Sequence, residues 1–212
     1  YDVHVELERR IAAFHDREAA MAFSSAYATI VSTIVPLVTR DTVLISDELN
    51  HNCIINAMRL ARPFDKAVYA HNDVAQLEAA LQRFAGQAKR ALVVTDGIFS
   101  MRGDHAPLAE IEAVCRRFDD AYEENVVLLV DDSHGVGAFG QTGRGTEEYT
   151  GAHADILVGT LGKAFGVHGG YITGSTAMCD FIRSFASGFI FTTALPPAVA
   201  AGARASIRHL KH

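Results

Sequence analysis

Short apolar runs alternate along the chain with amphipathic segments of about a dozen residues. Runs rich in β-branched and aliphatic residues predict strands at 42–46, 67–70, 91–95 and 126–130. Segments with apolar residues at helical spacing follow the first three runs, at 54–60, 73–84 and 108–118. Strands that are apolar at every position are typical of a parallel sheet buried on both faces. We therefore predict an α/β fold, with a mostly parallel sheet covered by helices on both faces.

The two ends of the chain extend this pattern. Val5, Leu7, Ile11 and Phe14 recur at near-helical spacing, which predicts an amphipathic helix that ends near His15. Two more strands and two more helices are predicted at 155–158, 170–173, 177–185 and 197–210, and Pro196-Pro197 opens the last helix. Because no Pro-, Gly- or Ser-rich linker divides the sequence, we expect a single domain over 1–212.

Composition and charge narrow the functional classes. The chain is 49% apolar and 21% charged, as in globular proteins, which disfavours a disordered protein. Its 19 Lys and Arg are scattered and are outnumbered by 25 Asp and Glu, giving a net charge of −6, so neither nucleic acid nor an anionic membrane is an expected partner. The most apolar stretch, 26–38, is interrupted by polar residues and is shorter than the ~20 apolar residues of a membrane span.

The number and spacing of the cysteines indicate the redox state of the compartment. Cys53, Cys115 and Cys179 are odd in number, far apart and outside any C-x-x-C pair, so neither a disulfide framework nor a zinc knuckle is expected. A reducing compartment fits this usage, and we expect a cytoplasmic protein.

Polar, titratable and glycine residues follow four of the predicted strands. These segments are Asp47–His51, Asp96–Ser100, Asp131–His134 and Gly159–Lys163. In open α/β sheets, ligands bind outside the carboxyl ends of the strands. The site is therefore expected at this edge of the sheet.

Three kinds of chemistry were weighed for this edge. Gly135–Gly140 fits the dinucleotide fingerprint G-x-G-x-x-G, but more glycines and no apolar period follow it, so a loop is favoured over the helix that such a site needs. Asp131, Asp132 and His134 could bind a metal, but no further ligand stands at helical spacing, so no metal is expected. Lys163, in a glycine-flanked turn downstream of a carboxylate, suits Schiff-base chemistry with pyridoxal phosphate (PLP).

Five ordered motifs resemble those of the α-oxoamine synthases, which are fold-type I, PLP-dependent acyl-CoA:amino acid transferases. The motifs are DELNH (47–51), DGIFSM (96–101), DDSHGVG (131–137), GTLGKAFG (159–166) and FIFTTALPP (189–197). The resemblance covers nearly the whole chain and implies the fold-type I large domain, with pyridoxal 5'-phosphate as cofactor.

The resemblance assigns roles to the residues nearest the reaction. Lys163 would form a Schiff base with the cofactor and later remove the α-proton of the amino acid. Asp131 would pair with the pyridinium nitrogen and keep the ring protonated. Asp132 is the competing candidate for that role. Because successive strand residues face opposite ways, only one of the two can point at the ring. His51 would stack on the face of the pyridine ring.

The remaining assignments concern the rim of the cofactor. The resemblance places Ser100 and His134 near the phenolic oxygen of the ring, with His134 also near the substrate or its developing oxyanion. Ser25-Ala26-Tyr27 matches a helix-opening turn whose N–H groups bind the phosphate. Thr160 would add a hydroxyl there, and Thr192 would reach the phosphate of a partner subunit, because the family's site lies across a homodimer interface.

The implied reaction joins a small amino acid to an acyl-CoA. The motifs look most like glycine C-acetyltransferase, with glycine and acetyl-CoA as substrates, and 8-amino-7-oxononanoate synthase and 5-aminolevulinate synthase are the alternatives. An aminotransferase of the same fold type and a non-catalytic cofactor-binding fragment are further alternatives. The chain begins at Tyr1 rather than Met, and neither the family's N-terminal segment nor its C-terminal small domain, with its carboxylate-binding arginine, is visible. We therefore expect a fragment, truncated at both ends.

Overall fold

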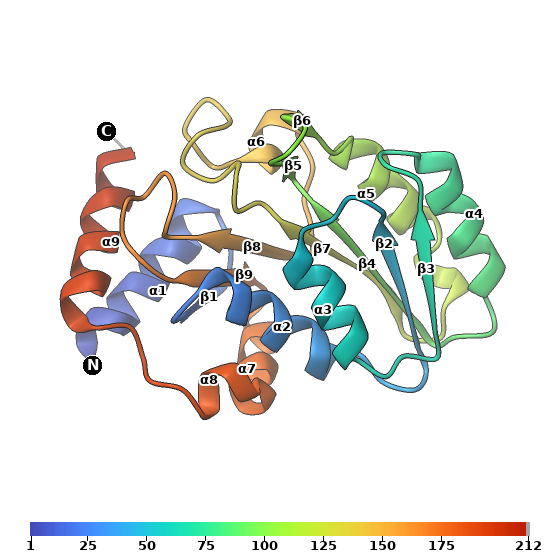
Figure 1. Ribbon diagram of the computed structural model, residues 1–212, viewed down its shortest axis with the longest axis horizontal. Helices are drawn as coiled ribbons and strands as arrows, with labels where there is room; N and C mark the ends of the chain where they lie inside the picture. The colour runs from blue at the N-terminus through green and yellow to red at the C-terminus, as the bar shows by residue number, and fades with distance from the viewer. Residues whose placement is uncertain (211–212) are drawn as a thin grey trace.

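A mixed seven-stranded sheet organises the computed structural model, which describes residues 1–210 (Figure 1). Its strands are β1 (Ala19–Phe23), β2 (Thr42–Asp47), β3 (Asp65–Tyr69), β4 (Arg90–Asp96), β7 (Asn125–Asp131), β8 (Ile156–Thr160) and β9 (Gly170–Gly174), in the order β1-β9-β8-β7-β4-β2-β3. The pairs from β3 to β8 are parallel, whereas β9 runs antiparallel to both β8 and β1. This arrangement confirms the predicted α/β class and its mostly parallel sheet.

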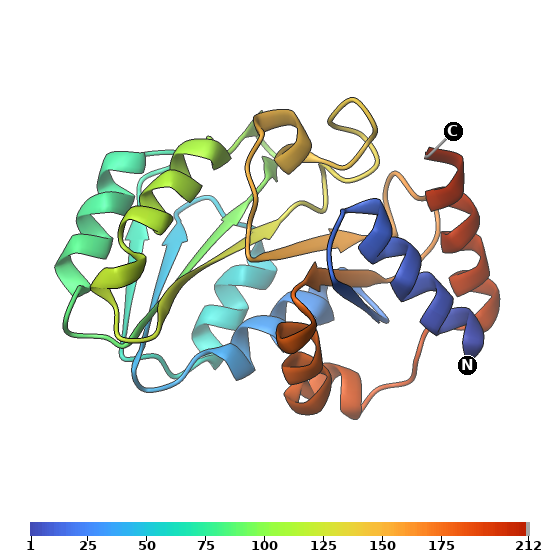
Figure 2. The ribbon, with the colours of Figure 1, turned by 180° about the vertical axis from the view of Figure 1, so that it is seen from behind.

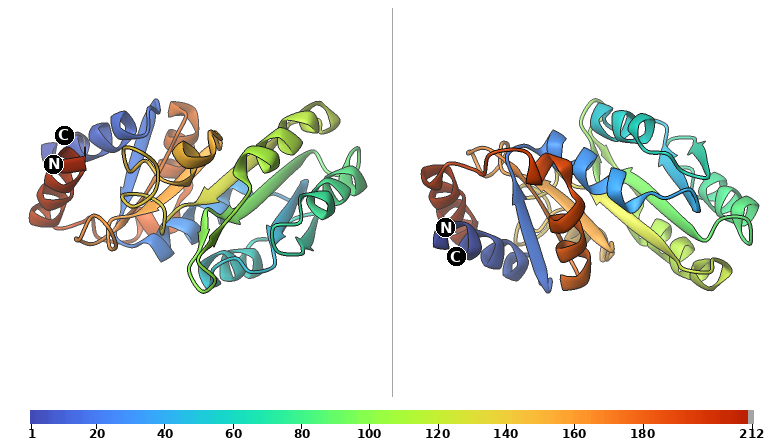
Figure 3. Two further views of the ribbon diagram at one scale, coloured as in Figure 1. Left: turned by 90° about the horizontal axis from the view of Figure 1, so that it is seen from above. Right: turned by 90° about the horizontal axis from the view of Figure 1, so that it is seen from below.

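Helices cover both faces of this sheet. They are α1 (Asp2–Phe14), α2 (Ala26–Leu37), α3 (Asn52–Leu60), α4 (Val74–Phe84), α5 (Leu108–Arg117), α6 (Thr146–Thr150), α7 (Thr176–Phe185), α8 (Ser187–Ile190) and α9 (Pro197–Leu210), with a 3-10 turn at Asp119–Ala121. Figure 1 faces the layer of α2, α3 and α7, and Figure 2 faces the layer of α1, α4, α5 and α9. The views along the vertical axis show α1 beside α9 (Figure 3).

Two separate apolar cores result from the two-sided sheet. Val43 and Ile45 of β2 point into the core beneath α4 and α5, whereas Leu44 between them points into the core beneath α2 and α3. This alternation explains why every residue of β2 is buried and why its central residues, Val43–Ile45, are all apolar.

Three local features differ from the expectation. Val5 is 66% exposed, because it lies on the opposite side of α1 from Leu7 and Ile11. The strand β1 and the helix α2 were not predicted from periodicity. Alanine-rich β1 is a strand because it pairs with β9 along its whole length, and α2 is apolar on most of its surface and so lacks a contrasting polar face.

The chain connections bring one set of loops to a common edge. The parallel strands β2, β4, β7 and β8 end at Asp47, Asp96, Asp131 and Thr160, and a small hairpin, β5 (Ile98–Phe99) with β6 (Asp104–His105), follows β4. Among residues 1–210, no helix is long and apolar enough to cross a membrane.

Candidate active site

A pocket lies at the carboxyl edge of the parallel strands, where the sequence predicted a site. Seven of the predicted residues line it: Ala26, Tyr27, His51, Ser100, Asp131, His134 and Lys163. They come from the start of α2, the start of α3, the β5–β6 hairpin and the loops after β7 and β8. Residues as far apart as 26 and 163 therefore meet in one cavity.

Ser25, Thr160 and Thr192 are not among the residues that line the pocket. Ser25 is the N-cap of α2, and its hydroxyl accepts a hydrogen bond from the N–H of Ala28 at 3.1 Å. Thr160 donates to the carbonyl of Gly169 and accepts from the N–H of Gly162. Thr192 is exposed and donates to the carbonyl of Gly188 at 2.6 Å. Their predicted contacts with phosphate stay predictions.

The structure separates the two neighbouring carboxylates, Asp131 and Asp132. Asp131 lines the pocket and accepts from the N–H of Ser133 at 3.1 Å. Asp132 is fully buried away from the pocket, where it accepts from the N–H of Thr146 at 2.6 Å and from the Thr146 hydroxyl. The backbone alternation of the strand therefore puts only Asp131 in reach of a pocket ligand.

Asp96 is a pocket carboxylate to which the sequence assigned no role. Its Cα is the register partner of Asp131 on the adjacent parallel strand, so the two side chains emerge at neighbouring points of the sheet edge. Burial, and then the charge of Asp131, raise the pKa of Asp96 well above its ordinary value. Asp96 therefore favours its protonated form.

Lys163 stands in the turn after β8 and shares the pocket with these carboxylates. Burial lowers the pKa of Lys163, and the charges of Asp131 and Asp96 oppose that shift in part. A lysine with a lowered pKa spends more time as the free amine, which is the nucleophilic form. The amine is therefore suited to bonding a carbonyl carbon.

His51 and Cys53 join the start of α3 to the two strand ends. The His51 N–H donates to Asp96 Oδ2 at 3.0 Å, and its Nδ1 accepts from the N–H of Cys53 at 3.3 Å. The Cys53 thiol lies 2.9 Å from that Nδ1 and 3.7 Å from Asp131 Oδ2. These contacts fix the imidazole at the pocket wall.

His134, on the other side of the pocket, is held in its neutral form. Burial lowers the pKa of His134, and the nearby charge of Lys163 lowers it further. A neutral imidazole can donate one hydrogen bond and accept another.

The other unassigned pocket residues are Cys53, Ile98 and Ser133. The sequence places Asp96–Ser100 directly after a predicted strand, but the spacing of residues in this segment does not indicate that Asp96 and Ile98 face the cavity. Cys53 lies two residues after His51, so the helical start that places one side chain also places the other.

The alternative chemistries find no support at this edge. Gly135–Gly140 lies in turns, and helix α6 begins only at Thr146, so the fingerprint does not open a helix. The interpretation of these glycines as a loop is confirmed. Within residues 1–210, no three His, Cys, Asp or Glu side chains gather as a metal site would require.

Comparison with known proteins places the chain in a family. The model of the family described as "Aminotransferase class I and II" matches residues 1–212. The chain belongs to the aminotransferase class I and II family. The members of this family are PLP-dependent, which confirms the predicted cofactor.

Individual relatives narrow the family further. The chain is 45% identical to the 5-aminolevulinate synthase of Rhizobium meliloti, over 98% of this chain and 50% of the relative. It is 43% identical to a putative 8-amino-7-oxononanoate synthase of Bacillus licheniformis, over 94% of this chain and 51% of the relative. These relatives confirm the resemblance to the α-oxoamine synthases, and neither of the two is named as a glycine C-acetyltransferase.

A solved structure carries the same fold. Serine palmitoyltransferase from Sphingomonas wittichii is 34% identical, with a TM-score of 0.92 over 100% of this chain and 52% of that one. The predicted fold type I is therefore confirmed. The chain spans about half the length of the relatives it matches.

Proposed function

We propose that this chain is the PLP-binding large domain, 1–212, of an acyl-CoA:amino acid C-acyltransferase of the α-oxoamine synthase type. The observation that carries the proposal is that Lys163, Asp131 and Asp96 line one pocket beside the N-terminus of α2. The sequence motifs favour glycine and acetyl-CoA as substrates and a 2-amino-3-keto acid as product. The names of the relatives favour 5-aminolevulinate synthase or 8-amino-7-oxononanoate synthase as the second candidate.

The residues of the pocket fit PLP. Within the described residues, Asp96 Oδ1 and Ser133 Oγ are buried without a hydrogen-bond partner, so the pocket holds polar groups that a polar ligand would satisfy. The first N–H groups of α2 lack intrahelical partners and carry a positive partial charge, which suits a phosphate. Asp131 supplies the carboxylate that an aromatic N–H requires.

Each residue would have a separate task. Bound PLP supplies an electron-accepting ring that stabilises negative charge on the α-carbon of an amino acid. The Lys163 amine would hold the cofactor and later take the proton from that α-carbon. Asp131 would accept the ring N–H, and His51 would cover one face of the ring. His134, neutral by its lowered pKa, would donate to the substrate oxygen.

The surroundings of the site form the rest of the proposal. Ser25-Ala26-Tyr27 and Thr160 would bind the phosphate, and Ser100 would donate to the phenolic oxygen. Thr192, which is exposed, would serve the site of a second copy in a cytoplasmic homodimer. An aminotransferase would use the same cofactor residues but would need no thioester.

The decisive experiment is reduction with borohydride after incubation of the chain with PLP, followed by mass mapping of peptides. A pyridoxyl group confined to Lys163 is the expected result. Lys163→Ala should abolish it, whereas Lys89→Ala, which removes an exposed lysine paired with Glu123, should leave it unchanged. Label spread over several lysines would contradict the proposed site.

The reaction type needs a second measurement, made on a protein that contains this chain and has the full length of its relatives. Release of free CoA from acetyl-CoA that depends on glycine would support the acyltransferase. Formation of a keto acid from the amino acid, with the thioester left intact, would support the aminotransferase instead.

A further inference from the structure

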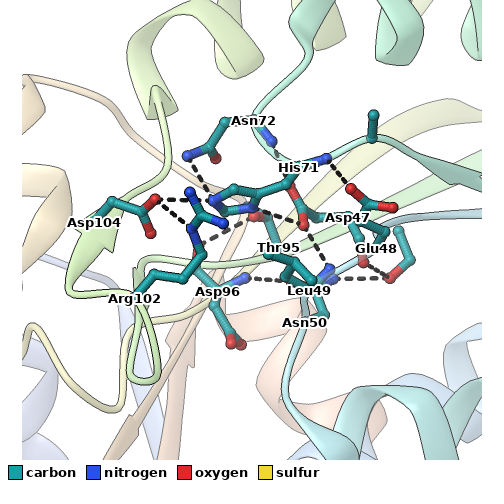
Figure 4. A network of polar contacts seen from close by, with 12 residues as sticks. Asp47, Glu48, Leu49, Asn50, His71, Asn72, Thr95, Asp96, Arg102 and Asp104 are labelled. Atoms are coloured by element: carbon teal, nitrogen blue, oxygen red, sulfur yellow. Dashed lines mark hydrogen bonds and ion pairs between the residues drawn. The ribbon is translucent and has the colours of Figure 1, made fainter.

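His71 lies between two carboxylates just after β3, at the border of the pocket (Figure 4). Its Nδ1 is 3.1 Å from Asp47 Oδ1, and its Nε2 is 3.1 Å from Asp104 Oδ2. The imidazole is 11% exposed, and the Asp47 side chain is wholly buried. None of these three residues lines the pocket or has a role in the proposed reaction.

One end of this bridge is firmly held. Asp47 ends β2, and its carboxylate also accepts from the backbone N–H groups of Leu49 and Asn72, each at 2.8 Å. The backbone N–H of His71 donates to Glu48 Oε1 at 2.9 Å. The imidazole is therefore anchored to the central sheet through the end of β2.

The other end of the bridge belongs to the β5–β6 hairpin. Asp104 lies in β6 and also accepts from Arg102 Nε at 3.0 Å. The His71 ring meets the ring of Phe99, in β5, edge to face at 4.3 Å between centroids. Both strands of the hairpin thus contact the same imidazole.

The hairpin contributes directly to the pocket. Ile98 begins it and Ser100 follows β5, and both side chains line the cavity. The hairpin strands are only two residues long, and two-stranded hairpins are marginal by themselves. Contacts outside the hairpin must therefore hold Ser100 in place.

We propose that His71 is a positioning residue that bridges Asp47 and Asp104 and thereby holds the β5–β6 hairpin, with Ser100 and Ile98, against the pocket. The part of the proposal that concerns the cofactor rests on the proposed function. The bridge itself does not, because it joins only protein groups.

Protonation controls the strength of this bridge. A neutral imidazole has one N–H and can donate to one carboxylate only, whereas the imidazolium donates to both. Burial by itself would lower the pKa of His71, but the hydrogen bonds and charges of Asp104 and Asp47 outweigh it, and the pKa is raised above 6.5. The bridge is complete below pH 6.5 and is lost as the pH rises through this raised pKa.

The charged groups around His71 come from two segments. The end of β2 presents Asp47 and Glu48, and the hairpin presents Asp104 with Arg102. His105 and Asp73 are near in sequence but make other contacts, with the carbonyl of Ala106 and the N–H of Gln76 respectively. Carboxylates therefore dominate the surroundings, which favours the imidazolium.

Hydrogen exchange of the full chain tests the bridge directly. In His71→Ala, amides 98–103 should lose about tenfold in protection at pH 6, because local opening of the hairpin becomes easier. His105→Ala is the matched control in the same hairpin and should change protection less than about twofold. In the wild-type chain, the protection of amides 98–103 against hydrogen exchange should fall as the pH rises. In His71→Gln, which keeps one hydrogen-bond donor, this protection should not fall.

Binding of PLP, followed by its absorbance, supplies the second readout. His71→Ala should weaken PLP binding about tenfold, and His105→Ala should not. Unchanged hairpin protection in His71→Ala, or the same pH profile in wild type and His71→Gln, would overturn the bridge. Loss of protection with unchanged PLP affinity would overturn its link to the pocket. Failure of the wild-type chain to bind PLP would overturn the proposed function and leave the exchange test of the bridge intact.

Discussion

Replacement of Asp132 by alanine tests the division of labour between the two adjacent carboxylates. Asp132 is fully buried and holds Thr146, the first residue of α6, through two hydrogen bonds. A Cβ at Gly135 or Gly145 would overlap its carboxylate, so this side chain fills the space that the two glycines leave. The chain therefore uses Asp132 to fasten the loop after β7.

The magnitude follows from the two lost bonds. A hydrogen bond to a charged group contributes about 1.5–3 kcal/mol, so two of them correspond to about 3–6 kcal/mol. Burial raises the pKa of Asp132 to about 7, which means that desolvation of the charge offsets part of this gain. We therefore expect Asp132→Ala to lower the free energy of unfolding by about 3 kcal/mol, a large share of the ~5–15 kcal/mol of a typical domain.

Equilibrium unfolding in urea measures the effect, with Asp131→Ala as the matched control. Asp131 loses the bond from the Ser133 N–H and the longer contact from the Cys53 thiol, beside a pocket that water can enter, so we expect about 1 kcal/mol. The order of the two variants should be reversed for PLP binding: Asp131→Ala should lose far more affinity for PLP than Asp132→Ala. Equal losses of stability, or a loss below about 1 kcal/mol in Asp132→Ala, would refute the reasoning.

Two further predictions concern buried charge. The folded pKa of Asp96 is raised above 3.8, so the folded chain keeps a proton that the unfolded chain releases, and stability should fall as the pH rises from about 4 towards that pKa. Asp96→Asn should flatten this profile in urea titrations at several pH values, and parallel profiles would contradict the assignment. Arg17 and Glu147 form an ion pair with side chains 4% and 10% exposed, so Arg17→Ala should cost about 3–5 kcal/mol by leaving a buried carboxylate unpaired. A double-mutant cycle with Glu147→Gln checks this value, and a coupling energy below about 0.5 kcal/mol would exclude a strong pair.

Local pattern was enough to predict most elements. The predicted strands at 42–46, 91–95 and 126–130 correspond to β2, β4 and β7, because the central residues of a strand covered on both faces are mostly apolar. The start of α9 at Pro197 followed from proline's fixed φ and missing N–H. β1 escaped prediction because its strand conformation depends on pairing with β9, about 150 residues away, rather than on its alanine-rich sequence.

Some residues of the candidate site could likewise be found from the sequence, whereas others needed the tertiary structure. Lys163, Asp131 and the helix start at Ser25 could be found from the sequence, because each sits in a motif or at a strand or helix end whose chemistry is local. The choice of Asp131 over Asp132 needed the direction of each side chain, and the role of Asp96 needed the register between β4 and β7. The motifs named the right family.

By itself the sequence determined the two-sided, mostly parallel sheet, the edge at which polar groups gather and the family, whose members depend on PLP. These follow from periodicity and from motifs that are contiguous in the chain. Only the tertiary structure decided that Asp96 lies beside Asp131 in one pocket, and that His71 bridges Asp47 to Asp104. Such contacts join segments tens of residues apart, and burial together with the spacing between charges, which no local pattern records, determines their energies.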